Sequence, residues 1–377
     1  MDTLTHGLIA AVAARSFSKQ DSHKPLWLAA TLAAIFPDLD YFLFWLDPYR
    51  FITEWHRGLS HSLIMLPIWA FLISSVFYLI LKRRLPLTKL FVYCSLGLLT
   101  HLAADLITVY GTQLFAPLNK HRFALRLTFD IDAWMGVLAF FSLVLSFIHR
   151  HYTRYGVLAI GVYLVFLIVC QQTAQSIAES RLPGTDRTAR YYALPQPLLP
   201  YDWQLVIDRH GHYEIAYLSL SRTAWQYFST WLTWEKPKTA NETRVLQKHK
   251  KNAQYHFQQP DILAFKPQQA LQWRNLEKLG GLQQSALVEE VWKSDVFTAF
   301  RRFASFPVLY RIDKDRQDEC VWFTDLRYVY PVFKPPFRYG MCRNRAERLW
   351  RLFRLRRESI NERQRLNIYP GFRQQTH

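Results

Sequence analysis

Histidine and aspartate side chains recur in the apolar first half of this sequence. His101 and Asp105 are four residues apart in "HLAAD", so on a helix they share one face about one turn apart and could bind one cation together. Asp38 and Asp40 lie among apolar and aromatic residues in "AAIFPDLDYF". Neighbouring carboxylates in such surroundings are costly unless a cation or hydrogen-bond donors offset their charge. The pattern therefore predicts a bound cation.

The other candidate ligands lie close to the ends of the same apolar segments. His56 and His61, in "HRGLSHS", can converge only if His56 lies in a loop and His61 in the first turn of the next helix. A single histidine on a helix is more often a core side chain than a ligand, and a His–Asp pair can simply lock two helices together. The predicted metal ligands are His6, Asp38, Asp40, His56, His61, His101, Asp105 and Asp132, with Asp130 as the alternative to Asp132 in "FDID".

This ligand set suits a divalent metal that could activate a water molecule. Imidazole and carboxylate without thiolate suit a divalent ion, zinc first and manganese or iron as alternatives, and the number of ligands allows more than one ion. A water activated by the metal would be the nucleophile, with Asp40 or Asp105 as its base. Arg57, between the two histidines, could hold an anionic group such as a phosphate, although an arginine there is also commonly a solvated charge. No serine-hydrolase, Walker or dinucleotide motif occurs in the sequence.

Long apolar segments must position these side chains. About 17 to 25 apolar residues span a bilayer as a helix, and residues 63–81 and 90–110 meet this length, while 134–148 and 155–170 need their flanks. Residues 3–17 and 25–46 complete the series, the first too short to span fully, and Pro37 predicts a helix end or break beside the two acids. The expected fold is an α-helical polytopic membrane bundle of about six segments, with a buried soluble core as the alternative.

Alternate crossing of the membrane places every candidate ligand on one side. The opposite side has more basic residues in its short loops: Arg15, Lys19, Lys24, Lys82, Arg83, Arg84, Lys89, Arg150 and Arg154. The loops on the ligand side carry five: Arg50, Arg57, Lys120, Arg122 and Arg126. By the positive-inside rule the first side is cytoplasmic. We therefore expect the site and everything after residue 175 on the non-cytoplasmic side.

The second half of the sequence is polar and basic. Of the formal charge of +18, residues 1–174 contribute +5 and residues 175–377 contribute +13. Pro-rich residues 175–200 are interpreted as a linker, and 201–335 as a small β-rich domain with a hairpin over 203–220 and strands over 306–312 and 320–333. Cys320 and Cys342 could pair, but nothing in the sequence requires it.

Residues 336–377 are predicted to form a basic amphipathic tail. Its helix, over 343–366, would carry Leu349, Trp350, Phe353 and Leu355 near one face. Such a helix could lie on anionic lipid headgroups or pack on its own β-rich domain. Nucleic-acid binding is not expected, because no base-reading module accompanies the charge.

Five blocks carry a resemblance to a known family: "LTHGLIAAVAA", "FPDLDYF", "HRGLSHS", "LTHLAADLITVYGTQLFAPL" and "DIDAW". In this order and spacing they resemble the YdjM-like, membrane-bound, metal-dependent hydrolases, over about residues 1–175. The resemblance implies a bacterial inner-membrane protein with ligands at His6, Asp38, Asp40, His56, His61, His101 and Asp105. Members usually have Asp-Pro where this chain has Asp132-Ala133, which loosens the match at Asp132. A LexA-type partner is implied only by the family's label as LexA-binding.

The resemblance also implies a substrate class. The family is distantly similar to zinc-dependent phospholipase C and P1 nuclease, which by analogy points to phosphodiesters. The function expected for residues 1–174 is therefore hydrolysis of a phosphoester in a lipid or envelope component. The expected partners are membrane lipids and a small or lipid-like anionic substrate. The alternative is a non-catalytic protein, either a metal-stabilised scaffold or an ion transporter.

Overall fold

The computed structural model describes most of the chain in two units. The described residues are 1–17, 24–182, 188–223, 253–255, 264–279, 285–314, 318–330, 335–344, 349–355 and 363–366. The first unit comprises residues 1–173 and 194–200, and the second comprises 174–193 and 201–377.

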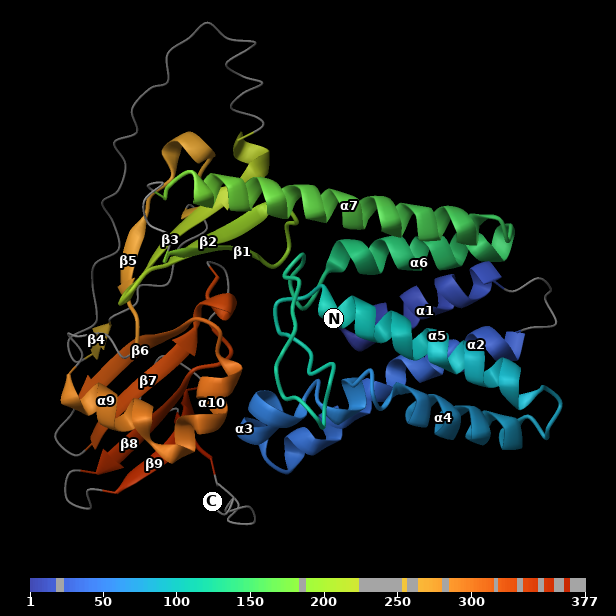
Figure 1. Cartoon of the computed structure of the whole chain (residues 1–377), viewed down its shortest axis with the longest axis horizontal. Coiled ribbons are helices and arrows are strands. Elements are labelled where there is room, and N and C mark those ends of the chain that lie inside the picture. Colours follow the sequence, from blue (N-terminus) through green and yellow to red (C-terminus); the bar gives the residue numbers. More distant parts are fainter. Residues whose placement is uncertain are drawn as a thin grey trace, which may run out of the picture. The chain divides into compact units, whose positions relative to one another are not determined.

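The first unit is a bundle of helices (Figure 1). Its longer helices form where the apolar segments predict them. The elements are α1 (Thr3–Phe17), α2 (Lys24–Ile35), the 3-10 helix η2 (Phe36–Trp45), α3 (Pro48–Arg50), the π-helix η3 (Phe51–Trp55), the 3-10 turn η4 (Leu59–His61), α4 (Leu66–Ile80), α5 (Leu87–Leu106), α6 (Ala133–Ile148) and α7 (Tyr152–Glu179).

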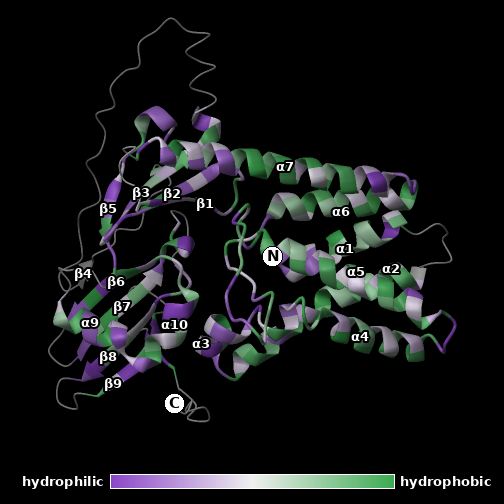
Figure 2. Cartoon of the chain, in the orientation of Figure 1, coloured by the Kyte–Doolittle hydropathy of each residue, from purple (hydrophilic) through white to green (hydrophobic). Residues whose placement is uncertain are grey.

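Within the described residues, three helical stretches are long and apolar enough to cross a membrane: Pro25–Trp45, α5 and α7. A fourth is added if Pro48–His61 and Leu66–Ile80, bent by 70° at the break between them, count as one span. The expectation of about six segments is thus confirmed only in part, because α1 and α6 form as predicted but are only 15 and 16 residues long. Apolar residues dominate α4, α6 and α7 (Figure 2), and many of their large side chains are exposed, as lipid contact requires.

Small residues let α2 and α5 approach closely. A Cβ added to Gly97 would lie 2.0 Å from the carbonyl oxygen of Ala30, so only glycine fits there. Buried Ala29 and Ala33 pack in the same cluster as Cys94 and Leu98. One turn beyond this contact, Ala34 and His101 face each other across the same interface. The glycine therefore sets the helix spacing that the site depends on.

The predicted break in the second segment is confirmed. The α-helical part ends at Ile35, and the chain continues as η2, with Pro37 in its first turn. Proline has no N–H to donate to the preceding turn, so the regular α-helical bonding stops there. Asp38 is buried directly after this change.

The second unit contains two antiparallel sheets. The first has the order β1-β2-β3-β5, and the second β10-β9-β8-β7-β6-β4. The predicted hairpin over 203–220 is confirmed by β2 and β3, and the predicted strand over 306–312 by β6. The strand predicted over 320–333 is confirmed only as far as Asp325 in β7, because Leu326–Tyr328 form a 3-10 turn and residues 331–333 lie outside the described part. The strands are β1 (Arg190–Pro195), β2 (Asp202–Asp208), β3 (His212–Ser219), β4 (Ala253–Tyr255), β5 (Arg274–Glu277), β6 (Pro307–Lys314), β7 (Asp318–Asp325), β8 (Tyr339–Asn344), β9 (Trp350–Leu355) and β10 (Arg363–Arg365).

Short helices and a disulfide complete this unit. Trp292 of α9 (Ala286–Lys293) packs on Phe323 of β7, with ring centroids 5.1 Å apart. Cys320 and Cys342 lie opposite each other in the β7–β8 register and form a disulfide. The other helical elements are η6 (Gln268–Ala270), η7 (Asp295–Phe297), α10 (Thr298–Phe303) and η8 (Leu326–Tyr328).

The predicted helix over 343–366 is wrong. Its described residues fall in β8, β9 and β10, and residues 345–348 and 356–362 lie outside the described part. Trp350 pairs with Arg343 of β8, whose guanidinium stacks on the indole at 4.5 Å. Pairing on both sides of β9 therefore overrides the helical pattern of the isolated sequence. The predicted linker also differs, because α7 continues to Glu179 and residues 190–195 form β1.

Candidate metal centre

Four segments bring histidines and aspartates together at one end of the helical unit. Asp38 comes from η2 and His61 from η4, while His101 and Asp105 come from the last two turns of α5. His6 comes from the first turn of α1. His61, His101 and Asp105 have no exposed surface, and Asp38 is 7% exposed. The i, i+4 spacing of His101 and Asp105 thus places both in one site, as predicted.

Three ligand atoms meet without hydrogen-bond partners. They are Nε2 of His61, Nε2 of His101 and Oδ2 of Asp105, all buried and unpaired among the described residues. Asp105 Oδ2 lies 3.3 Å from His61 Nε2 and 3.5 Å from His101 Nε2. Buried polar atoms are almost always paired, so three converging orphans mark a place for a cation.

The spacing of these atoms fits a zinc-sized ion. Ligand atoms about 2.0–2.2 Å from a tetrahedral ion lie about 3.4 Å apart, close to the observed 3.3 and 3.5 Å. Asp38 Oδ1 is next, 3.6 Å from His61 Nε2 and 3.8 Å from His101 Nε2. Two imidazoles and a carboxylate, with a fourth position near Asp38, match the donor set of catalytic zinc sites.

A second group of candidate ligands shares a member with the first. His6, Asp38 and His101 offer atoms that lie within 4.8 Å of one another. The His6 and His101 rings are stacked, with centroids 3.7 Å apart. His101 Nε2 has one lone pair, so one ion at a time can use it.

The backbone fixes the orientation of His101. Its Nδ1 lies 2.6 Å from the carbonyl oxygen of Ala34, an acceptor that requires the proton on Nδ1. Nε2 is then the unprotonated nitrogen, the form that binds metals. Where a 3-10 helix begins, the carbonyl of Ala34 would accept from residue 37, but Pro37 has no N–H. The proline therefore leaves this carbonyl available to the histidine.

Asp105 is held by its other oxygen. Oδ1 contacts His6 Nε2 at 3.1 Å and Arg57 Nη2 at 3.0 Å, and the backbone nitrogen of Met1 contacts it too. These contacts leave Oδ2 facing His61 and His101. Arg57 is in the left-handed region, with φ of 56°, a strained conformation for a side chain of this size.

Arg57 connects the site to the loop after α5. Its guanidinium donates to Thr108 at 2.6 Å, lies 3.8 Å from Asp130 and packs 5.0 Å from the centroid of the Tyr110 ring. Burial raises the pKa of Tyr110, whose hydroxyl donates to the carbonyl of Ile52. Tyr110 therefore lines the site as an uncharged side chain.

Asp40 and His56 lie together beside the three orphan atoms. His56 Nδ1 is 3.0 Å from Asp40 Oδ1, and His61 Nδ1 is 3.6 Å from Asp40 Oδ2. The two histidines converge on one carboxylate, and His56 lies in a loop as expected. His61 does not lie in the first turn of the next helix, because it ends the 3-10 turn η4 and α4 begins only at Leu66. Asp40 faces Nδ1 of His61, whereas the orphan atoms surround Nε2.

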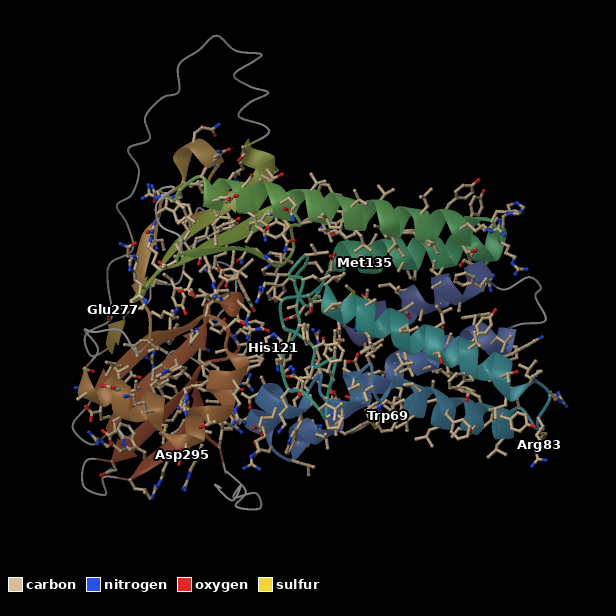
Figure 3. The ribbon with its side chains drawn as sticks, viewed as in Figure 1. Trp69, Arg83, His121, Met135, Glu277 and Asp295 are labelled. Carbon is tan, nitrogen blue, oxygen red and sulfur yellow. A yellow bond between two sulfur atoms is a disulfide. The ribbon has the colours of Figure 1, made fainter. Side chains whose placement is uncertain are left out.

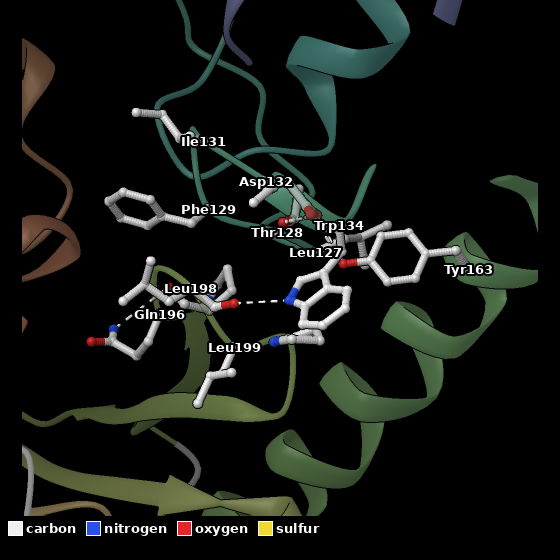
Figure 4. A pocket seen from close by; sticks show the side chains of 13 residues that line it. Leu127, Thr128, Phe129, Ile131, Asp132, Trp134, Tyr163, Gln196, Leu198 and Leu199 are labelled. Carbon is white, nitrogen blue, oxygen red and sulfur yellow. Dashed lines mark hydrogen bonds between the residues drawn. The ribbon is translucent and has the colours of Figure 1, made fainter. Parts of the chain in front are cut away.

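Asp132 lies elsewhere in the fold. It caps the N-terminus of α6 by accepting from Met135 N at 2.9 Å, and it accepts from Thr128 and from the hydroxyl of Tyr163. Figure 4 shows it in a separate pocket, next to Trp134, which donates to the carbonyl of Leu198. Of the two aspartates in "FDID", Asp130 is the one that lies near Arg57.

Several contacting residues had no signal in the sequence. Thr3 donates to Asp38 Oδ2 at 2.6 Å, and Ser60 and Thr108 bond Asp40 and Arg57. Hydroxyl side chains are common in any helix or loop, so only the fold identifies these three. Ser60 and Thr108 lie inside the blocks "HRGLSHS" and "LTHLAADLITVYGTQLFAPL", but neither block assigns a role to its hydroxyl residues.

Comparison with known proteins agrees with the apolar helices of the first unit. Residues 1–178 match the family described as YdjM inner membrane protein. This part of the chain belongs to that family. The uncharacterized protein YfhP of Bacillus subtilis is 28% identical over 152 residues, which cover 38% of this chain and 44% of YfhP, so the chain spans less than half of that relative. No solved structure gives a significant match.

Proposed function

We propose that the YdjM-family part of this chain is a metal-dependent hydrolase of phosphoesters in a membrane lipid or envelope component. The observation that carries the proposal is the convergence of three buried, unpaired ligand atoms from η4 and α5. Charge supports it as well. The site holds four carboxylates, those of Asp38, Asp40, Asp105 and Asp130, whereas the guanidinium of Arg57 and the amino group of Met1 supply the permanent positive charge beside them, so a divalent cation would offset the excess.

In this proposal His61, His101 and Asp105 hold the ion. When bound, such an ion acts as a Lewis acid that activates water and polarises a phosphoryl oxygen. Asp38 Oδ1 lies 3.6 Å from His61 Nε2 and 3.8 Å from His101 Nε2, and we assign it the role of accepting the proton of the attacking water. Asp38 is more exposed than His61, His101 and Asp105, so in this proposal the substrate reaches the site from the side of Asp38.

Arg57 supplies the positive charge for an anionic substrate. Its guanidinium lies beside Asp105, with a planar set of donors that suits a phosphate group. The site lies in a unit whose helices expose large apolar side chains, so a phosphoester carried by a lipid could reach it from the bilayer. A LexA-type partner has no counterpart among these features and stays an expectation from the family label.

The side of the membrane follows from charge and from the disulfide. Arg83 marks the turn between α4 and α5 (Figure 3), at the end of the bundle away from the site, where Arg150 and Arg154 also lie, while Lys19 is outside the described residues. Basic short loops favour the cytoplasm. α7 runs from that end back toward the site end, and the Cys320–Cys342 disulfide beyond it suits an oxidising compartment. We therefore place the site and the second unit outside the cytoplasm.

Hydrolysis of a chromogenic phosphodiester and of a labelled phospholipid by the detergent-purified chain tests the function. We expect turnover that a chelator abolishes and one divalent cation restores. Metal bound without any turnover would instead favour a metal-stabilised scaffold. Ion flux through vesicles containing the chain would favour a transporter.

A further inference from the structure

Ser60 forms hydrogen bonds with two residues of the site, Asp40 and His61. Its Oγ lies 3.0 Å from Asp40 Oδ2 and 2.9 Å from His61 Nδ1. A serine hydroxyl has one proton to donate and lone pairs to accept. The direction of these two hydrogen bonds therefore decides which nitrogen of His61 carries a proton.

Asp40 determines that direction. The carboxylate also receives His56 Nδ1 at 3.0 Å and the backbone N–H of Arg57 at 3.4 Å, so donors point at both of its oxygens. An ionised carboxylate accepts hydrogen bonds only. Ser60 must then donate to Asp40, and its oxygen accepts from His61 Nδ1–H.

The consequence appears at the other nitrogen of the ring. With the proton on Nδ1, His61 Nε2 carries a lone pair, and this atom is the one that lies 3.3 Å from Asp105 Oδ2 without a partner. We infer that Asp40 and Ser60 form a positioning pair that holds His61 in its metal-binding tautomer. This inference rests on the proposed metal site, and it makes Asp40 a positioning residue in place of a ligand or base.

The two histidines of the site are then fixed in the same way by different partners. The carbonyl of Ala34 holds the Nδ1 proton of His101, and Ser60 holds that of His61. Both rings present Nε2 to Asp105 Oδ2. Partners of this kind commonly change metal affinity by about 10- to 100-fold when removed.

Two substitutions test the pair from opposite directions. Ser60→Ala removes the acceptor for His61 Nδ1–H. Asp40→Asn keeps the shape but presents an NH₂ group, which would donate to Ser60, turn its hydroxyl toward His61 Nδ1 and move the ring proton to Nε2. Ser62→Ala is the matched control, because Ser62 is two residues away and its hydroxyl bonds the carbonyl of Ala116 at 2.6 Å.

The measurements are zinc affinity by competition with a chelator and the His61 tautomer by ¹⁵N NMR, both on the full chain in detergent. We expect Ser60→Ala to weaken zinc binding about 10- to 100-fold, Asp40→Asn to move the proton to Nε2, and Ser62→Ala to change neither. A Ser60→Ala chain that binds zinc as tightly as the wild type would overturn the inference. Loss of zinc in Asp40→Asn but not in Ser60→Ala would also overturn it, because Asp40 would then be a direct ligand. If the wild type binds no metal, the proposed function fails, while the tautomer of the metal-free chain still tests the pair.

Discussion

At the scale of single residues, the site depends on which carboxylate oxygen is already occupied. Both oxygens of Asp40 receive hydrogen bonds, and Asp105 is held through Oδ1 by Arg57 and His6. Asp38 Oδ2 accepts from Thr3, but Oδ1 faces the two imidazoles at 3.6 and 3.8 Å. With Asp105 Oδ2 assigned to the metal, Asp38 Oδ1 is the carboxylate oxygen that we assign to take the proton.

This arrangement predicts that Asp38→Asn separates catalysis from metal binding. Phosphodiester turnover should fall about 100-fold, the usual contribution of a general base, while the metal content stays that of the wild type. Metal analysis and initial rates on the same preparation check both. Turnover equal to the wild type would remove Asp38 from the reaction, and loss of metal would make it a ligand.

The sequence predicted the candidate ligands better than the residues that hydrogen-bond to them. His101 and Asp105 are recognisable because a four-residue spacing has one meaning on a helix, and the structure places them together. Asp132 shares the residue type but not the place, because it caps α6. Ser60 and Thr3 could not be found in advance, since a hydroxyl gains its role only from the carboxylate that the fold brings beside it.

At the scale of elements, the α2–α5 contact sets the distance between the ligands. Gly97 and Ala30 touch one turn before His101 meets Ala34, so a larger side chain at residue 97 moves the two helices apart where the site begins. Sequence periodicity predicted both helices, but the pairing of these two faces required the three-dimensional structure.

Gly97→Ala should therefore destabilise the protein and weaken metal binding together. The new Cβ would lie 2.0 Å from the Ala30 carbonyl oxygen, and such overpacking costs about 1–3 kcal/mol. Gly161→Ala in α7 is the control, because nothing lies within 4 Å of its added Cβ. Thermal unfolding in detergent with and without zinc checks this. A Gly97→Ala protein as stable and as metal-rich as Gly161→Ala would contradict the proposed role of the contact.

The strands show where local pattern is insufficient. The hairpin of β2 and β3 was predictable because alternating apolar residues flank the turn at Gly211, whose φ of 95° suits glycine. The sequence "WRLFRL" has no such alternation, and its strand forms because β8 and β10 pair with it on both sides. Long-range pairing of this kind leaves no local signal in the sequence.

At the scale of the whole molecule, the account predicts which compartment the second unit occupies. Alkaline phosphatase fused after His377 should be active, because the basic turns between α4 and α5 and between α6 and α7 favour the cytoplasm and α7 runs away from that end. A green fluorescent protein fused at the same point should be dark. A fluorescent fusion with inactive phosphatase would reverse the orientation and place the site in the cytoplasm.

The central claim concerns a metal ion at His61, His101 and Asp105, and metal analysis of the purified chain tests it most directly. Wild type should carry close to one equivalent of zinc or manganese. His101→Ala and His61→Ala should lose it while still inserting into membranes, whereas His121→Ala, which alters an exposed loop histidine outside the cluster (Figure 3), should keep it. Metal content unchanged in both cluster variants would contradict the site.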